Sequence, residues 1–139
     1  MQISRELTDS AVNLFKGKNF GFIASIMKDG SPQLTPVWID YDGQFLLVNT
    51  AEGRTKQKNF DRDPRVAISV VDQNNPYNMV SIRGKVVQQT TDGADEHIDK
   101  LAKKYLGVDK YPLRNPDEKR IILKIKPEKI FHMSIGIKS

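Results

Sequence analysis

The sequence predicts a small, mainly β protein: a six-stranded, mostly antiparallel barrel with peripheral helices packed outside. Three observations support this fold class. Six segments show the two-residue alternation or the short apolar runs that are typical of strands. Asp-Gly pairs between neighbouring segments are typical of tight hairpin turns. The helical segments do not alternate regularly with the strands, which argues against parallel βαβ units.

The first half of the chain is expected to contain one helix and three strands. The helix is expected within Ser4 to Phe15, where apolar residues recur at helical spacing, and Gly17 is expected to end it. The strands are expected at Phe20 to Met27, Gln33 to Tyr41 and Gln44 to Thr50, separated by the turns Asp29-Gly30 and Asp42-Gly43. The two short turns predict an antiparallel meander.

The second half is expected to contain three more strands, at residues 66–71, 79–88 and 120–126. Gly84 interrupts the second of them, which indicates a β-bulge or the close approach of another backbone. Asp92 to Leu106 has helical spacing, and Gly107 is placed to cap that helix. In the last strand the inward-facing residues are expected to be Ile121, Leu123 and Ile125.

Length and composition limit the classes of function. At 139 residues the chain fits a single domain spanning residues 1–139. The net charge of +5 favours an anionic partner, such as a phosphorylated cofactor or nucleic acid. Without cysteine the chain has no disulfide and no thiolate nucleophile, so redox chemistry requires a bound cofactor. No apolar run is long enough for a membrane helix and the N-terminus lacks a signal-peptide pattern, so a cytoplasmic location is expected.

The segment 50–66 carries the clearest chemical signal. A hydroxyl at Thr50, a glycine at Gly53 and cations at Arg54 and Lys56 come together where a short helix is expected to begin. Helix N-termini present unpaired N–H groups and a partial positive charge to anions. The segment therefore indicates a phosphate-holding corner, although a solvated basic helix without a ligand fits the local spacing equally well.

Three segments in consecutive order support the first interpretation. They are residues 30–38 (GSPQLTPVW), residues 59–66 (NFDRDPRV), and Pro76-Tyr77 followed by residues 80–86 (VSIRGKV). Together they resemble the pyridoxamine 5′-phosphate oxidase-like split-barrel family, and more narrowly its short branch that binds FMN or the deazaflavin F420. The resemblance covers roughly residues 21–87. It implies a split β-barrel and a homodimer that holds two flavin-type cofactors in grooves between its subunits.

The resemblance also implies where the phosphate of the cofactor is held. By position, the family's phosphate contacts fall on Asn49, Thr50, Arg54 and Lys56. Asn59 matches a helix residue near the phosphate. Arginine can grip phosphate oxygens with two parallel hydrogen bonds, whereas lysine offers a point charge. These five residues are the expected anion-binding set.

The ring of the cofactor is implied to lie along a strand edge formed by Pro36, Val37 and Trp38. Gln33, at the ring end of the same strand, and Tyr77, on a loop that can reach the substrate side, are further candidates. Trp38 is equally compatible with a role as a core aromatic residue. No catalytic residue is assigned, because hydride transfer belongs to the cofactor.

The implied activity is hydride transfer to or from a small conjugated or aromatic substrate, which the sequence does not identify. F420 is favoured over FMN because Lys58, Arg62 and Arg65 offer cations to its acidic tail. Oxidation of pyridoxamine phosphate itself is not expected, since that enzyme's arginine- and histidine-bearing C-terminal signature is not found. Two alternatives stay open: a non-catalytic flavin-binding or carrier protein, and a basic barrel that binds single-stranded nucleic acid. The latter is disfavoured because cations and aromatic residues are not interleaved on one strand.

The two histidines carry little signal in the sequence. His97 is expected to be a solvated residue on a helix, whereas for His132 a place in an inter-subunit groove stays open. Neither has a carboxylate cluster at ligand spacing, so no metal site is expected. The irregular segment 108–118 has no readable chemistry, and whether it reaches the site also stays open.

Overall fold

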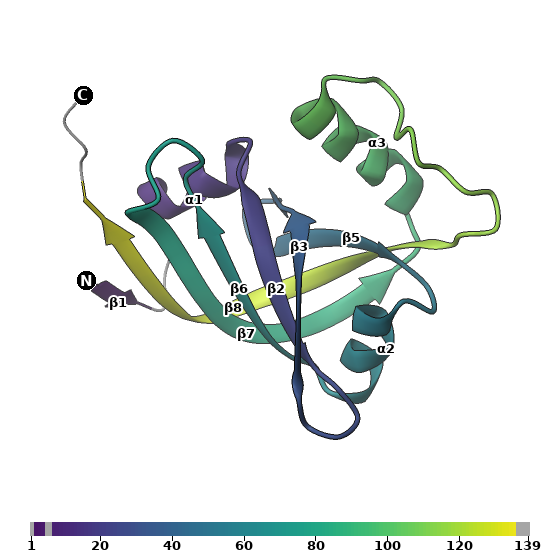
Figure 1. The fold of residues 1–139 in the computed structure, drawn as a ribbon, viewed down its shortest axis with the longest axis horizontal. Coiled ribbons are helices and arrows are strands. Elements are labelled where there is room, and N and C mark those ends of the chain that lie inside the picture. The colour runs from purple at the N-terminus through teal and green to yellow at the C-terminus, as the bar shows by residue number, and fades with distance from the viewer. Residues whose placement is uncertain (1, 5–6, 136–139) are drawn as a thin grey trace.

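The computed structural model describes residues 2–4 and 7–135, which form one curled antiparallel sheet and three helices (Figure 1). The expected fold class is confirmed. The described strands are β1 (Gln2–Ser4), β2 (Phe20–Ile26), β3 (Pro32–Trp38), β4 (Asp40–Tyr41), β5 (Leu46–Ala51), β6 (Arg65–Val71), β7 (Asn78–Thr90) and β8 (Arg120–Ser134). The helices are α1 (Asp9–Lys16), α2 (Thr55–Arg62) and α3 (Ala94–Leu106). The six expected strands cover all of these but the short β1, and the strand expected at Gln33 to Tyr41 is divided at Ile39 into β3 and β4.

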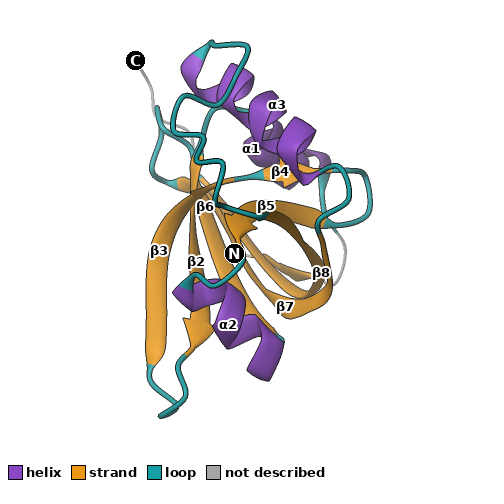
Figure 2. Cartoon of the chain, turned by 90° about the vertical axis from the view of Figure 1, so that its right-hand side faces the viewer, coloured by secondary structure: helices purple, strands orange, loops and turns teal. Residues whose placement is uncertain are grey.

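Both hairpins of the expected meander form, but the three strands do not make a continuous meander. β2 pairs with β3 and β4 pairs with β5, but β5 then pairs with β8, so the strand order is β3-β2-β6-β7-β8-β5-β4. The chain leaves the β2–β3 hairpin at Ile39, whose side chain is fully buried and whose N–H donates to the Tyr105 hydroxyl at 3.0 Å. Because β3 and β5 do not pair in the described sheet, the barrel is split between them (Figure 2).

The inner face of the sheet encloses the hydrophobic core. Alternate residues of each strand point inward, as Ile23 on β2 and Ile68 on β6 illustrate. The inward orientation expected for the last strand is confirmed. The buried residues of this core include Leu14, Phe15, Leu46, Val48, Val70, Val80, Ile82, Ile121, Leu123, Ile125 and Ile130.

β8 is longer than expected, because it continues through Pro127 to Ser134. Proline normally ends a central strand, so the sequence predicted an end at Lys126. The expected irregularity at Gly84 is confirmed. The pairing register of β7 and β8 shifts between Arg83 and Gly84, and a Cβ at Gly84 would lie 2.0 Å from the carbonyl oxygen of Lys126. The bulge therefore requires glycine at this position, opposite the proline.

The helix ends follow the local sequence. α1 begins after Thr8, whose hydroxyl accepts a hydrogen bond from the N–H of Ala11 at 3.2 Å. α2 ends at Arg62 and is capped by Asp63, immediately before Pro64. α3 ends at Leu106 and is capped by Gly107, which has the left-handed conformation with φ of 73°. None of the described helices has the length and apolar character needed to cross a lipid bilayer.

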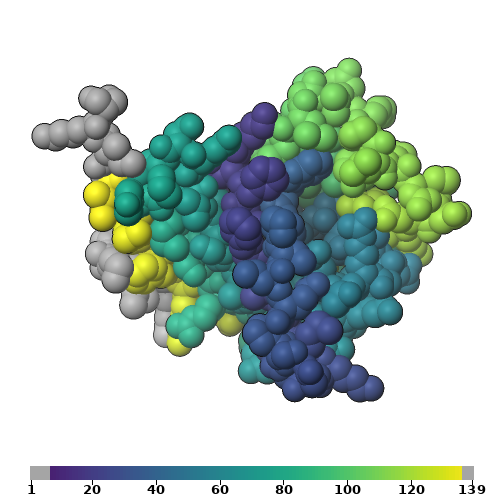
Figure 3. Space-filling view, in the orientation of Figure 1, coloured from purple at the N-terminus to yellow at the C-terminus, as the bar shows by residue number. Residues whose placement is uncertain are grey.

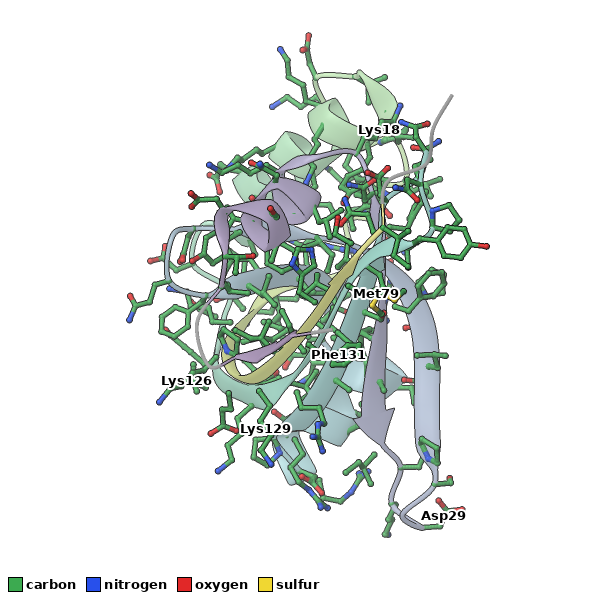
Figure 4. The ribbon with its side chains drawn as sticks, turned by 90° about the vertical axis from the view of Figure 1, so that its left-hand side faces the viewer. Lys18, Asp29, Met79, Lys126, Lys129 and Phe131 are labelled. Atoms are coloured by element: carbon green, nitrogen blue, oxygen red, sulfur yellow. The ribbon has the colours of Figure 1, made fainter. Side chains whose placement is uncertain are left out.

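The outer face of β2 and β3 is apolar and exposed. Phe20, Phe22 and Leu34 have relative exposures of 51%, 42% and 64%. Across the sheet, the row of Phe22 passes through Ser69 and Ser81 before it reaches Phe131 on β8, the strand that Figure 4 shows beside β7 with Met79. The apolar part of the outer face is therefore centred on β2 and β3, where exposed apolar side chains indicate an interaction surface.

Candidate functional site

A cavity of about 380 Å³ lies beside the edges of β3 and β5, at the split of the barrel. Six of the ten predicted site residues line it: Pro36, Val37, Trp38, Asn49, Arg54 and Lys56. The remaining lining residues are Phe20, Ile98, Leu101, Leu106, Tyr111, Leu113 and Arg120. Figure 3 shows this side of the molecule, where the green surface of α3 and the segment after it lies above the surface of β5 and α2.

One end of the cavity is cationic. Arg54 is the N-terminal flanking residue of α2, Lys56 is half-buried in its first turn, and Arg120 is the first residue of β8. Burial lowers the pKa of Lys56, and the charges of Arg54 and Arg120 lower it further. Glu118 accepts hydrogen bonds from Arg54 at 2.7 Å and from Arg120 at 3.1 Å. Three cations and one carboxylate leave this end with a net positive charge, which favours an anion.

Arg120 was missed at the level of sequence. Its side chain is only 8% exposed, and its guanidinium carbon lies 5.4 Å from the centre of the Tyr111 ring. Arg120 is brought to the cavity because β8 pairs with β5, where it stands opposite Ala51. A correct prediction that β5 pairs with β8 would have placed Arg120 beside Arg54 and Lys56.

The other end of the cavity is aromatic. The Trp38 ring stacks on Tyr105 with centroids 5.3 Å apart and meets Tyr111 edge-on at 6.0 Å. Tyr105 is buried, and its hydroxyl donates to the carbonyl of Asn19 at 2.6 Å. Trp38 therefore packs against α3 and also lines the cavity, so the two roles considered for it are compatible.

The segment 108–118 reaches the cavity through Tyr111 and Leu113. Asp99 on α3 holds this segment, because its carboxylate accepts from the Tyr111 N–H at 2.8 Å and from Arg114 at 2.7 Å. The hydrogen bond from the Tyr111 N–H is the main reason why the pKa of Asp99 is lowered. The segment therefore lines the same cavity as the six predicted residues.

Four predicted site residues do not line the cavity. Thr50 lies on the inner face of β5 with its buried hydroxyl lacking a hydrogen-bond partner among the described residues. Asn59 donates to Ser25 at 2.9 Å, and Ser25 donates to Gln33 at 3.1 Å, so these three residues form a separate network between α2 and the β2–β3 hairpin. Tyr77 is exposed in the turn between β6 and β7.

The expectation that His97 is solvated is wrong. His97 is 8% exposed and lies between Asn49, 3.1 Å from Nδ1, and Asp40, 3.0 Å from Nε2. Burial raises the pKa of Asp40, but hydrogen bonds from His97 and the Tyr41 N–H, with the charge of Lys100, outweigh it and lower that pKa to about 2. The apolar spacing of α3 could not reveal partners that lie on β4 and β5.

His132 lies on β8, 3.3 Å from the Asn78 side chain, and does not line the cavity. Within residues 2–4 and 7–135, no three His, Asp or Glu side chains are grouped as they would be around a metal ion.

A second cavity, of about 430 Å³, opens on the outer side of the sheet. Its lining includes Ala24, Pro32, Ala67 and four cations, Arg65, Arg83, Lys85 and Lys129. None of the ten predicted site residues lines it. It lies next to the exposed apolar face of β2 and β3, so we assign it to that face rather than to the candidate site.

Comparisons with known proteins agree with the fold. The sequence model of the family described as pyridoxamine 5′-phosphate oxidase matches residues 7–134. A solved F420 reductase is 28% identical and superposes with a TM-score of 0.79 over 90% of this chain and 98% of the other. A candidate pyridoxamine 5′-phosphate oxidase from Listeria innocua (20% identity, TM-score 0.70, covering 91% and 98%) shares the fold. HupZ from Group A Streptococcus (20% identity, TM-score 0.68, covering 96% and 99%) does so too.

Proposed function

Because the chain belongs to the pyridoxamine 5′-phosphate oxidase family, we propose that it is an oxidoreductase that binds F420 or FMN in the cavity at the split of the barrel. The observation that carries this proposal is the meeting of three cations and an apolar strand edge in a single cavity. Such an arrangement suits a ligand with an anionic end and a flat ring. The cavity volume of about 380 Å³ lies in the range of small-molecule sites.

The two ends of the cavity have separate roles in this proposal. Arg54, Lys56 and Arg120 hold the phosphate, where the guanidinium groups supply paired hydrogen bonds. Residues 36–38 and Tyr111 hold the ring and exclude water from it. When bound, the flavin or deazaflavin supplies the hydride chemistry, and the protein supplies position and electrostatics. The substrate is proposed to be a small conjugated or aromatic molecule that lies against the exposed side of the ring.

Of the two cofactors, we favour F420, because the F420 reductase is similar over nearly its whole length. Two of the additional cations expected to meet the acidic tail of F420, Arg62 and Arg65, have partners within the protein. Arg62 donates to the carbonyl of Ile26 at 2.8 Å and to Asn59 at 2.9 Å, and Arg65 is paired with Asp63 at 2.7 Å. Both arginines are therefore engaged within the α2 region and its neighbouring strands.

We further propose that the protein is a homodimer in which the second copy covers the outer face of β2 and β3. The exposed side chains of Phe20, Phe22 and Leu34 support this proposal. Light scattering coupled to size exclusion should give twice the mass of one chain. Phe22→Lys should shift the protein toward monomer and weaken cofactor binding, whereas Val87→Lys, at an exposed apolar position outside this face, should do neither. A native protein that is monomeric at micromolar concentration contradicts the assembly.

The first experiment on function is to identify the small molecule that co-purifies with the protein by absorbance and mass, followed by parallel titrations with FMN and F420. We expect one cofactor to bind, and its reduced form to pass hydride to a conjugated acceptor. A protein that binds a cofactor but oxidises and reduces nothing in an acceptor screen would favour the carrier alternative. Tight retention of single-stranded nucleic acid, uncompeted by flavin, would overturn the proposal.

A further inference from the structure

We propose that His97 is a positioning residue that orients Arg120 toward the anion in the cavity, acting through the side chain of Asn49. This inference rests on the anion site proposed above. Arg120 is buried, and its Nε donates to Asn49 Oδ1 at 2.8 Å while one terminal nitrogen donates to Glu118. Among the described residues nothing accepts from its other terminal nitrogen, Nη2. That group is left for a ligand in the cavity that Arg120 lines.

The side-chain amide of Asn49 has three hydrogen-bond partners, and two of them reveal its orientation. Its Oδ1 faces Arg120, which can only donate, and its Nδ2 donates to the carbonyl of Ala94 at 2.9 Å, which can only accept. Exchanging the oxygen and nitrogen of this amide would break both hydrogen bonds. Nδ2 must therefore also face His97 Nδ1, 3.1 Å away.

This orientation selects one form of the imidazole. Because Asn49 donates to Nδ1, that nitrogen carries no proton, and the proton lies on Nε2, which donates to Asp40 Oδ2 at 3.0 Å. Lys100, on the same helix, lies 3.4 Å from the same carboxylate oxygen. Asp40 thus holds the His97 tautomer, the tautomer holds the Asn49 amide, and the amide holds Arg120.

The relay has a definite consequence for the site. If His97 offers no acceptor, Asn49 loses one of the partners that keep its oxygen toward Arg120. The guanidinium is then held less firmly, by Glu118 and by an Asn49 that only Ala94 still orients, so more of its ordering falls to the ligand. The bound anion should lose affinity, whereas contacts to the ring at residues 36–38 should not change, because they do not involve this relay.

The decisive variants differ in one acceptor atom. His97→Asn places an oxygen near the position of Nδ1 and preserves the acceptor for Asn49, whereas His97→Leu removes it. FMN and riboflavin share a ring and differ in the phosphate, so titrating both separates the two ends of the cavity. We expect His97→Leu to weaken FMN about tenfold with riboflavin unchanged, and His97→Asn to restore FMN affinity to within about threefold. Glu96→Gln, the preceding exposed position on α3, serves as a control and should behave as the native protein.

Two results would overturn the positioning role. Equal weakening of FMN and riboflavin by His97→Leu would mean that His97 only supports α3, and a His97→Asn variant as weak as His97→Leu would mean that the acceptor is irrelevant. Nitrogen NMR of the ligand-free protein tests the relay even if no flavin binds. The Arg120 Nε–H should exchange slowly with water in the native and His97→Asn proteins and faster in His97→Leu. Unchanged exchange in His97→Leu would refute the relay independently of the proposed cofactor.

Discussion

The two ends of the cavity are built differently. At the cationic end, Arg54 and Lys56 are neighbours in sequence at the start of α2, and Arg120 joins them through the pairing of β8 with β5. At the aromatic end, Trp38 and Tyr105 come from segments far apart in the chain, and the stack exists because α3, which packs on β5 and β8, reaches Trp38 at the end of β3. The charged end is thus mostly a local feature of the sequence, and the aromatic end is a tertiary one.

This difference predicts which properties each end controls. Burial, and after it the charges of Arg54 and Arg120, lower the pKa of Lys56, so an anion beside it relieves an existing cost. The aromatic residues already pack against one another, so a bound ring adds contact area but removes no unfavourable interaction. Variants at the charged end should therefore change affinity most strongly and selectively, and variants at the aromatic end should change it less and without regard to the phosphate.

The largest effect is expected for Lys56→Ala. Losing a hydrogen bond to a charged group costs about 1.5 to 3 kcal/mol, so the affinity for FMN or F420 should fall about tenfold or more. Fluorescence titration gives this value, and riboflavin provides the comparison without phosphate. For FMN, Lys58→Ala is the matched control, because Lys58 is on the same helix but does not line the cavity. Unchanged affinity in Lys56→Ala would remove Lys56 from the site.

The hydrogen-bonded network of Asp40, His97 and Asn49 should stabilise the folded protein above the pH at which Asp40 is protonated. The pKa of Asp40 is about 2 in the folded protein against 3.8 for the unfolded chain, so its contribution is present above pH 3.8 and is lost as the pH falls toward 2. Asp40→Asn should lower the free energy of unfolding by about 2 kcal/mol at neutral pH. Urea unfolding at several pH values should show the difference between the two proteins narrowing below pH 3.8. A difference that stays constant with pH would contradict this account.

A smaller effect is expected for Trp38→Leu at the aromatic end. An aromatic contact is worth about 0.5 to 1.5 kcal/mol beyond its buried area, so FMN, F420 and riboflavin should all weaken by about two- to tenfold. Melting temperature should be measured in parallel, because Trp38 also packs on Tyr105. Trp38→Phe should recover most of the affinity. If Trp38→Leu weakened FMN but not riboflavin, the assignment of the ring to this end would be wrong.

The smallest effect is expected behind the aromatic end, at Lys104. Its ammonium donates to the carbonyls of Phe15 and Ile39, and burial lowers its pKa to about 8. The unfolded chain then binds more protons above pH 8, so stability should rise with pH. Between pH 7 and 9 the gain should be about 0.5 kcal/mol, because the group is partly exposed. In Lys104→Met this rise should be absent; a variant that keeps the full rise would assign it to other groups.

The fold class and most strands were predictable because alternation and Asp-Gly turns are local signals. The pairing of β5 was not, because the turn at Ile39 depends on a hydrogen bond to Tyr105, which follows it by 66 residues. The end of β8 was misplaced because Pro127 is tolerated only opposite the bulge at Gly84. In each case the local sequence predicts the strand, and a residue distant in the sequence determines how the strand pairs or where it ends.

The candidate site shows the same division. Arg54 and Lys56 were identified from a basic corner at a helix start, and residues 36–38 from a family motif. Arg120 and the buried state of His97 could not be identified, since their partners Asn49 and Asp40 come from other strands. Local charge patterns therefore predicted the proposed anion end, and the residues proposed to orient it became visible only in the tertiary structure.

The most direct test of the account is a crystal structure of the protein with bound FMN or F420. The account predicts the phosphate within hydrogen-bond distance of Arg54, Lys56 and Arg120, and the ring along residues 36–38. A cofactor bound in the outer cavity near Arg83 and Lys129, with no ligand at the cationic end of the cavity at the split, would contradict it.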